Sequence, residues 1–218
     1  MHFGNIIKMF DKIYYINLDK RQDRRKYFEE NVKEPLLQYF PEELWKRISA
    51  EDKTNETSRS KRAAGCSISH VNIWKDAQEN GYKSFLVLED DFKLIIEPSA
   101  FREYISELYR DFSNFTICNV AYNNMRKLNK INNSNFYKSW NIQTTCGYIA
   151  KTEFVKKMQP TIEYSIEQLN SNLSYDIWAI DQVWKKFQNN SNWILMKRAG
   201  IQLDSYSDIE KNHVKYGV

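Results

Sequence analysis

A run of apolar residues that ends in three acidic ones constrains the fold of this chain more than any other feature of its sequence. The run covers residues 84–88 (SFLVL), and Glu89, Asp90 and Asp91 follow it directly. A continuous apolar segment of this length, bounded by polar residues, is typical of a strand that is buried on both faces. The sequence therefore predicts a central strand with three carboxylates immediately beyond its end.

Strand-like and helix-like segments alternate around this run. Apolar residues recur every three positions from Ile68 to Ala77, and Gly81 follows them, which predicts a helix over residues 67–80. Further strands are expected at residues 12–18, 46–49, 115–119, 147–150 and 193–196, and further helices at residues 23–30, 98–112, 152–158, 162–170 and 176–187. Residues 51–61 and 123–141 lack periodicity and are expected to be loops. This alternation predicts an α/β fold in which helices flank a mostly parallel sheet.

Composition and charge narrow the class of protein. With 218 residues, 42% of them hydrophobic, the chain can build one sizeable domain, and neither a repeat nor a linker divides it. A net charge of +4 suits a small anionic ligand and is too low to indicate nucleic acid. Cys66, Cys118 and Cys146 are widely spaced, so we expect reduced and mostly buried thiols.

Nothing in the sequence predicts export or insertion into a membrane. No apolar stretch reaches the length of a membrane span, and residues 1–11 lack the apolar core of a signal peptide. We therefore expect a soluble, cytoplasmic protein without a transmembrane segment. The heavy use of Asn, Lys and Ile indicates an AT-rich genome, such as that of some bacteria and viruses.

The three adjacent carboxylates, here called the acidic triplet, need a chemical reason because like charges so close repel one another. Ligands of open α/β sheets bind beyond the carboxyl ends of the strands, where Glu89, Asp90 and Asp91 would lie. A hard divalent cation, Mn²⁺ or Mg²⁺, would offset the repulsion and prefers oxygen ligands. Because side chains alternate along an extended chain, Glu89 and Asp91 would face one way and Asp90 the other. A solvated acidic turn is the alternative.

Two further pairs of residues suit an anionic ligand. Arg21 and Arg24 follow the first predicted strand, and arginine forks fit phosphates, although both would equally suit a solvated helix face. Ser69 and His70 are expected near the start of a helix, where backbone N–H groups attract anions. His70 could alternatively be a structural histidine.

Six segments of the chain resemble glycosyltransferase family 25, the group of lipopolysaccharide-biosynthesis and procollagen galactosyltransferase proteins. They follow the order of the family: residues 15–19 (YINLD) with Arg21, Asp23, Arg24 and Arg25; 47–50 (RISA); 65–70 (GCSISH) with Trp74; 85–92 (FLVLEDDF); 144–149 (TTCGYI); and 202–209 (QLDSYSDI). Two segments depart from it. Residues 174–178 (SYDIW) stand where the family often has Pro-x-Asp, and residues 123–141 match no family segment. Both departures fall where acceptor recognition is expected.

The resemblance implies a GT-A fold and an inverting, metal-dependent transfer of a sugar from a nucleotide-sugar donor. We expect a single domain over residues 1–218, with roughly residues 1–120 binding the nucleotide and roughly residues 121–218 binding the acceptor. The expected donor is a UDP-sugar carrying galactose or glucose. The acceptor would be a hydroxyl of a carbohydrate, a glycolipid or a hydroxylated protein.

Each candidate residue has an expected role in such a transfer. Asp91 and Glu89 would bind the metal, with Mn²⁺ or Mg²⁺ as the cofactor. The nucleotide sugar would contact Asn17, Arg21, Arg24, Arg47, Ser49, Ser69, His70, Glu89 and Asp90. The base that deprotonates the acceptor would be Asp176, with Asp181 in reserve, although Asp176 is also a suitable helix N-cap. His213 could complete the metal shell, on residue type alone.

The sequence is also compatible with two other functions. A metal-dependent nucleotidyltransferase or phosphohydrolase would also use carboxylates and a divalent ion, but no glycine-rich phosphate loop or second acidic cluster is evident. An inactive carbohydrate-binding or protein-binding homologue would tolerate loss of the acidic triplet. Because the acidic triplet is intact in this sequence, an enzyme is favoured.

Overall fold

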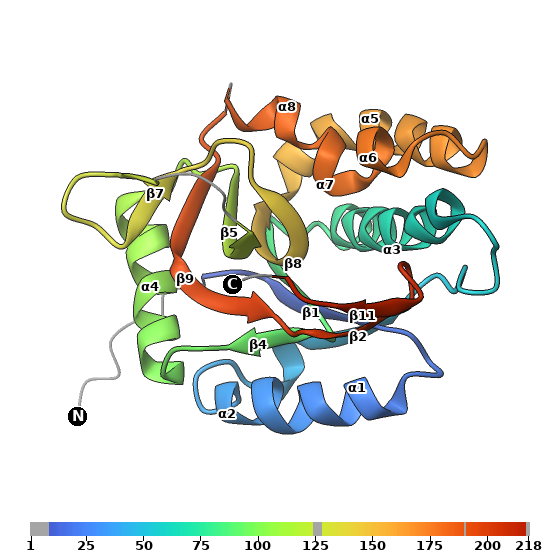
Figure 1. Cartoon of the computed structure of the whole chain (residues 1–218). Helices are drawn as coiled ribbons and strands as arrows, with labels where there is room; N and C mark the ends of the chain where they lie inside the picture. The colour runs from blue at the N-terminus through green and yellow to red at the C-terminus, as the bar shows by residue number, and fades with distance from the viewer. Residues whose placement is uncertain (1–8, 124–127, 190, 217–218) are drawn as a thin grey trace.

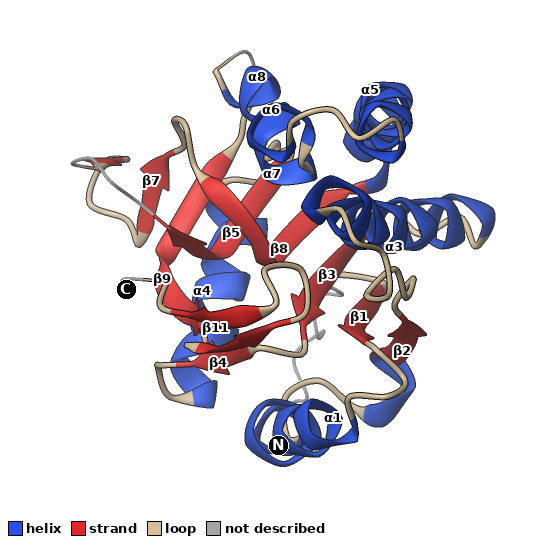
Figure 2. Cartoon of the chain, turned by 45° about the vertical axis from the view of Figure 1, so that its right-hand side comes forward, coloured by secondary structure: helices blue, strands red, loops and turns tan. Residues whose placement is uncertain are grey.

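The chain is built around a large mixed sheet with helices on both faces (Figures 1 and 2). The computed structural model describes residues 9–123, 128–189 and 191–216. Its large sheet contains β1 (Lys12–Asn17), β2 (Trp45–Ser49), β3 (Ser84–Glu89), β4 (Phe92–Leu94), β5 (Ile117–Asn123), β6 (Asn129–Lys130), β7 (Phe136–Lys138), β8 (Gln143–Lys151) and β9 (Ile194–Gln202). A small antiparallel hairpin pairs β10 (Ser205–Ser207) with β11 (Asn212–Val214).

Two groups of helices cover the sheet (Figure 1). Below it in that view is α1 (Gln22–Phe28), which continues through η1 (Glu29–Lys33) into α2 (Glu34–Leu36). The helix α4 (Pro98–Asp111) lies beside them. The short helix η2 (Glu42–Leu44) leads into β2. Above it are α3 (Arg59–Glu79), α5 (Thr152–Asn170), α6 (Tyr175–Trp178), α7 (Ile180–Val183) and α8 (Lys185–Gln188). None of the helices in the described ranges combines the length and hydrophobicity that a membrane span requires.

The strand order brings the ends of three parallel strands together. The large sheet runs β2-β1-β3-β8-β5-β9-β7-β6, and β4 pairs with β9. From β2 to β9, β8 alone runs against its neighbours, so the sheet is mostly parallel in direction, as predicted. Asn17 lies opposite Ser49, and Ile16 lies opposite Glu89. The carboxyl ends of β1, β2 and β3 therefore meet at one edge.

The alternation of side chains along the central strands builds two cores. On β3, Leu86 and Leu88 pack with α1, η1 and α4, whereas Phe85 and Val87 pack with α3 and α5. Successive side chains of a strand point to opposite faces of the sheet. Because both faces of β3 are covered, its residues are apolar without interruption, which is the pattern that predicted a central strand.

Phe92, directly after the acidic triplet, is held between two glycines. A Cβ atom added to Gly147 would lie 2.8 Å from Val120 and 3.1 Å from the Phe92 ring, and one added to Gly200 would collide with that ring. Phe92 itself is fully buried. Because Gly147 on β8 and Gly200 on β9 have no side chain, the Phe92 ring can pack between them. The packed ring fixes the end of β3 and the acidic triplet before it.

Replacing Gly200 with alanine is expected to destabilise the protein by about 1–3 kcal/mol, because the added methyl overpacks the site against Phe92. Urea unfolding of Gly200→Ala measures the loss. A second variant, Gly200→Ala with Phe92→Leu, should recover part of it, because the smaller side chain makes room. If the two losses simply add, the collision with Phe92 is not the cause.

Several predicted elements differ from those observed, for reasons that lie in tertiary contacts. The helix predicted from residue 67 begins at Arg59, inside a predicted loop, because Ser60, Ala63 and Ala64 are buried. The predicted break near Pro160 is absent, since α5 runs through it. The helix predicted over residues 176–187 is divided into α6, α7 and α8, with an extended backbone at Ala179.

Other elements were not predicted. Residues 123–141, expected to be a loop, contain β6 and β7, although residues 124–127 lie outside the described part. The short strands β4, β10 and β11 also carried no recognised signal. The three cysteines are free thiols, as expected: Cys118 and Cys146 are buried and Cys66 is half-buried.

Candidate active site

The acidic triplet lies at the edge where β1, β2 and β3 end, and it is enclosed. Glu89 is the last residue of β3, and Asp90 and Asp91 turn the chain into β4. Asp90 is 7% exposed and Asp91 is 5% exposed. A solvated acidic turn does not describe residues buried to this degree. Each carboxylate has its own set of partners.

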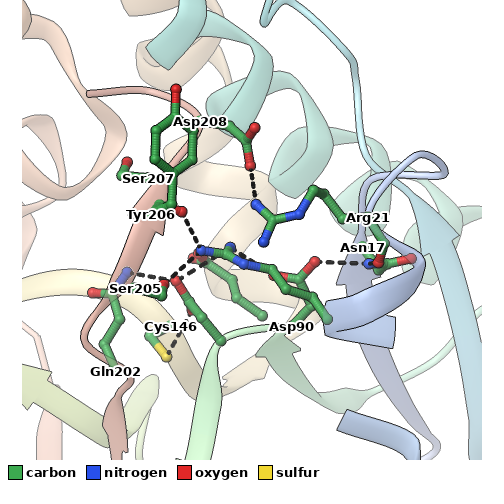
Figure 3. A network of polar contacts seen from close by, with 12 residues as sticks. Asn17, Arg21, Asp90, Cys146, Gln202, Ser205, Tyr206, Ser207 and Asp208 are labelled. Atoms are coloured by element: carbon green, nitrogen blue, oxygen red, sulfur yellow. Dashed lines mark hydrogen bonds and ion pairs between the residues drawn. The ribbon is translucent and has the colours of Figure 1, made fainter. Parts of the chain in front are cut away.

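Asp90 faces β1 and α1. Its Oδ2 accepts a hydrogen bond from Asn17 Nδ2 at 2.7 Å, and its Oδ1 accepts one from Arg24 Nη1 at 3.1 Å (Figure 3). Burial raises the pKa of the Asp90 carboxyl, and the charge of Arg24 opposes that rise. Asn17 and Arg24, predicted to bind the ligand, thus position one member of the triplet.

Asp91 faces β8 and the end of β9. Its carboxylate accepts hydrogen bonds from Cys146 Sγ at 3.6 Å and Gln202 Nε2 at 3.1 Å, and Arg24 Nη1 is 3.7 Å from its Oδ2. Burial and repulsion from Glu89 raise the pKa of Asp91 to about 7. The partners present therefore only partly compensate the charge of this carboxylate.

Glu89 also faces β8 and is held by a chain of buried hydrogen bonds. Thr145 Oγ1 donates to Glu89 Oε1 at 2.5 Å, and His70 Nε2 lies 3.2 Å from the same oxygen. Burial raises the pKa of the Glu89 carboxyl, but the hydrogen bonds from His70 and Thr145 outweigh burial and leave the pKa below its ordinary value. Glu89 and Asp91 thus face β8 while Asp90 faces β1, as the alternation of an extended chain predicted.

Two buried aromatic residues and the Glu89 carboxylate favour one tautomer of His70. Trp74 Nε1 can only donate, and it donates to the Tyr148 hydroxyl at 3.0 Å. The Tyr148 hydroxyl lies 3.0 Å from His70 Nδ1 and is free to donate its own proton there. His70 then carries its proton on Nε2 and donates it to Glu89. All three side chains, His70, Trp74 and Tyr148, are fully buried.

The donor set of the triplet fits a hard divalent cation. Glu89 and Asp91 provide oxygen ligands on the same side of the chain, and such oxygens are what Mn²⁺ and Mg²⁺ prefer. The raised pKa of Asp91 marks negative charge that the protein alone does not balance. Among the described residues, the one compact group of three potential ligands is Cys66, His70 and Glu89, which shares Glu89 with the triplet. His213 is outside this group, exposed on β11 with its ring against Tyr206.

The hairpin of β10 and β11 lies over the triplet and is tied to α1 (Figure 3). Arg24 Nη2 donates to Ser205 Oγ at 2.7 Å and to the Tyr206 carbonyl oxygen at 2.8 Å. Arg21 contacts Asp208 at 2.6 Å. The two arginines predicted to bind phosphate thus join the first and last segments of the site, and neither is on a simple solvated face.

Two cavities meet at the triplet. The first is lined by Asn17, Arg24, Ser69, His70, the triplet, Gln202 and Asp208, among others. The second, of about 750 Å³, is lined by residues of β8, α6, α7 and the hairpin, and it includes Asp176 and Asp181. Glu89, Cys66 and Gln202 line both cavities. The two cavities are therefore adjacent at these residues.

The two candidate bases differ in their surroundings. The side chain of Asp176 is 79% exposed and lies 3.7 Å from Arg59. Asp181 accepts a hydrogen bond from the Thr144 backbone N–H at 3.2 Å, and burial raises the pKa of its carboxyl. The raised pKa of Asp181 is of the kind that is common among catalytic carboxylates.

Of the remaining predicted residues, Arg47 and Ser49 line neither cavity, and Ser69 lies within α3. Arg47 donates to Asn17 Oδ1 at 3.0 Å, and Ser49 donates to Asp19 at 2.7 Å. Ser69 donates to the Gly65 carbonyl at 2.8 Å and accepts the Glu51 N–H at 2.9 Å. The prediction that Ser69 and His70 open a helix is wrong, because α3 begins at Arg59 and both lie in its middle. Helix N–H groups are therefore unavailable there for an anion.

Several residues of the site carried no role in the sequence interpretation. They are Thr145, Cys146, Tyr148, Gln202, Ser205 and Asp208. All lie in the segments 144–149 and 202–209 that carry the family resemblance, so the resemblance marked the segments. Their contacts with the triplet, His70, Arg21 and Arg24 join residues far apart in the chain, so no local sequence pattern predicts them.

The sequence matches a known protein family. Residues 10–184 match the model of the family described as Glycosyltransferase family 25 (LPS biosynthesis protein). Procollagen galactosyltransferase 1-B of Xenopus laevis is 26% identical over 103 residues, which cover 40% of this chain and 17% of that protein. The match thus spans less than a fifth of the length of that relative.

Solved structures share the fold. A glycosyltransferase involved in the glycosylation of the major capsid of PBCV-1 superposes with a TM-score of 0.54 at 13% identity, over 92% of this chain and 95% of the other. Mannose-1-phosphate geranyltransferase from Thermus thermophilus gives a TM-score of 0.52 at 12% identity, over 87% and 74%. At such identities these similarities bear on the fold, which is GT-A-like. Because the family model covers well over half of the 218 residues, this chain belongs to glycosyltransferase family 25.

Proposed function

We propose that this glycosyltransferase transfers a hexose, galactose or glucose, from a UDP-sugar to an acceptor hydroxyl with inversion. The observation that carries the proposal is the buried acidic triplet at the meeting point of two cavities, with one carboxylate, Asp91, whose charge is only partly compensated. One cavity would hold the donor and the other the acceptor. The donor would occupy the cavity that Asn17 and Arg24 line, and the acceptor the cavity that Asp181 lines.

Asp91 and Glu89 would hold the divalent cation, Mn²⁺ or Mg²⁺. When bound, such an ion stabilises the negative charge that develops on the leaving diphosphate. Arg24 lies beside the same carboxylates, and arginine forks bind phosphate oxygens in pairs. We infer that Arg24 and Arg21 exchange part of their contacts with Asp90 and Asp208 for contacts with the diphosphate. Asn17, Arg47 and Ser49 would contact the ribose and base.

Asp181 is our choice for the base, in place of Asp176. An inverting transfer needs a carboxylate on the acceptor side that takes the hydroxyl proton while the acceptor oxygen bonds to the anomeric carbon. As that bond forms, the bond between the carbon and the diphosphate oxygen breaks, and its electron pair leaves with the diphosphate. Asp181 lines the acceptor cavity, and its raised pKa makes it a stronger base than an exposed carboxylate. Asp176, on the exposed rim, is held instead by Arg59.

The lining of the acceptor cavity supports a carbohydrate as the acceptor. Five carboxamide side chains contribute to its polar lining: Asn123, Gln143, Gln182, Gln202 and Asn212. Amides both donate and accept hydrogen bonds, which suits the neighbouring hydroxyls of a sugar. Arg59 pairs with Glu210 at 2.6 Å, and the carboxylates of Glu89, Asp176 and Asp181 also line the cavity.

A donor screen tests this function. UDP release from UDP-galactose and UDP-glucose is measured with Mn²⁺ and with EDTA, beside the GDP- and CMP-sugars and the nucleoside triphosphates. We expect turnover of a UDP-hexose that needs the cation and rises when a neutral glycan acceptor is added. Release of pyrophosphate from a triphosphate, without turnover of any nucleotide sugar, would contradict the proposal and favour nucleotidyl transfer.

A further inference from the structure

We propose that Cys66, His70 and Glu89 form a binding site for a thiophilic divalent cation of the Zn²⁺ class, and that this ion inhibits transfer. The site is chemically distinct from the all-oxygen set of Glu89 and Asp91. Binding of the ion depends only on the three side chains. Its inhibitory effect rests on the proposed function.

The backbone places the three ligands together. Cys66 and His70 are four residues apart on α3, so their side chains project from the same face of the helix. Glu89 reaches them from the end of β3. One ligand atom from each lies within 4.8 Å of the other two. His70 Nε2 and Glu89 Oε1 are 3.2 Å apart, near the ~3.4 Å that separates nitrogen and oxygen on one tetrahedral zinc ion.

The combination of donors selects the class of ion. A thiol, an imidazole and a carboxylate form a mixed set that suits Zn²⁺ or Co²⁺, whereas Mg²⁺ favours oxygen alone. Zinc commonly takes three protein ligands and leaves a fourth position for water or substrate. Cys66 is half-buried and lines both cavities, so an ion and its water have an open route to it.

The surroundings of His70 and Glu89 already support them as ligands. A metal-bound histidine usually donates its other ring N–H to a fixed acceptor. The Tyr148 hydroxyl, 3.0 Å from His70 Nδ1, can accept a hydrogen bond from that N–H as well as donate one of its own. Binding would move the His70 proton from Nε2 to Nδ1 and release the Cys66 thiol proton to solvent. Thr145 would keep its hydrogen bond to Glu89.

Inhibition follows because Glu89 belongs to both sets of ligands. An ion held by Cys66 and His70 would draw the Glu89 carboxylate away from the Mn²⁺ or Mg²⁺ shared with Asp91. It would also stand where the two cavities meet, between donor and acceptor. Zinc should therefore compete with the activating cation, and excess Mn²⁺ should relieve the inhibition.

Cobalt provides the direct test of the site, because a thiolate bound to Co²⁺ gives an intense charge-transfer absorption that oxygen and nitrogen ligands do not. We expect the wild-type protein to show this band at one equivalent of Co²⁺ and to lose it when Zn²⁺ is added. Cys66→Ser should abolish the band and weaken Zn²⁺ binding, measured against a chromogenic chelator, by more than about a hundredfold. Cys118→Ala and His213→Asn are the matched controls, and both should keep the band. A wild-type spectrum without the band would overturn the site, whatever the variants do.

Activity separates this inference from the proposed function. With a UDP-sugar donor and Mn²⁺, micromolar Zn²⁺ should inhibit the wild type and leave Cys66→Ser at least about tenfold less sensitive. Stoichiometric, Cys66-dependent binding in a protein that turns over no nucleotide sugar would support the site and contradict the function. Mn²⁺-dependent transfer that zinc inhibits equally in both proteins would keep the function and overturn inhibition through this site.

Discussion

Replacing Asp91 with asparagine is expected to lower the rate of sugar transfer by about a thousandfold, equivalent to ~4 kcal/mol of transition-state stabilisation. Asparagine keeps the shape of the side chain and removes the charge on which binding of the divalent cation depends. Because Asp91 is buried, no neighbouring carboxylate can move freely into its place. Steady-state kinetics with Mn²⁺ and a UDP-sugar measure the loss. A variant that retains most of its activity would exclude Asp91 as a metal ligand.

The same variant should be more stable than the wild type at pH 8 when the metal is removed. Burial and Glu89 raise the pKa of Asp91 to about 7 in the folded protein, against about 3.9 for an unfolded chain. Between these values the folded state binds a proton that the unfolded state does not, so stability falls as the pH rises from about 4 to about 7. Asparagine avoids this loss.

Urea unfolding in EDTA at pH 5 and pH 8 provides the measurement. The advantage of Asp91→Asn should grow between pH 5 and pH 8 and reach about 1–3 kcal/mol at the higher value. Glu103→Gln, an exposed carboxylate on α4, is the control and should leave the stability nearly unchanged at both values. An Asp91→Asn protein that is less stable than the wild type at pH 8 would show that the carboxylate is well compensated.

Asp181→Asn is expected to lower transfer by about a hundred- to ten-thousandfold, the range typical of a lost general base. The affinity for UDP, measured by calorimetry with Mn²⁺, should stay within about twofold, because Asp181 lines the second cavity and not the first. Asp176→Asn is the matched control. Its exposed carboxylate should matter by less than about tenfold.

The pH dependence of the transfer rate is a second test of Asp181 as the base. Only the ionised carboxylate can accept the hydroxyl proton, so transfer should fall as the pH drops through the pKa of Asp181. Burial raises that pKa, and the acid limb should therefore lie above the ordinary range of an aspartate. A larger loss for Asp176→Asn than for Asp181→Asn would return the role to Asp176.

The sequence predicted the parts of the site that local patterns encode. The apolar run at residues 84–88 identified the central strand, and the position of Glu89, Asp90 and Asp91 after it placed the acidic triplet at the sheet edge. Asn17 and Arg24, taken from the family resemblance and from charge, proved to contact Asp90. The strand and the triplet depend on residues that are close together in the chain, whereas Asn17 and Arg24 lie far from Asp90 in sequence.

Features built by distant segments escaped prediction. Arg24 contacts Ser205, and Arg21 contacts Asp208, across almost the whole chain, so the hairpin over the site has no local signature. The helix α3 begins earlier than predicted because its first turns are buried. The polar sequence of these turns does not indicate that burial. Asp181 ranked below Asp176 because the sequence does not reveal which of two nearby aspartates is buried.

The most direct test of the central claim is a titration of Mn²⁺, followed by electron paramagnetic resonance, in the presence of UDP. Free Mn²⁺ gives a sharp signal that binding to the protein suppresses, so the number of bound ions and their affinity follow from the signal. We expect the wild type to bind one ion with UDP, and Asp91→Asn to bind it at least about a hundredfold more weakly. Equal binding by both proteins would contradict the assignment of the acidic triplet as the metal and diphosphate site.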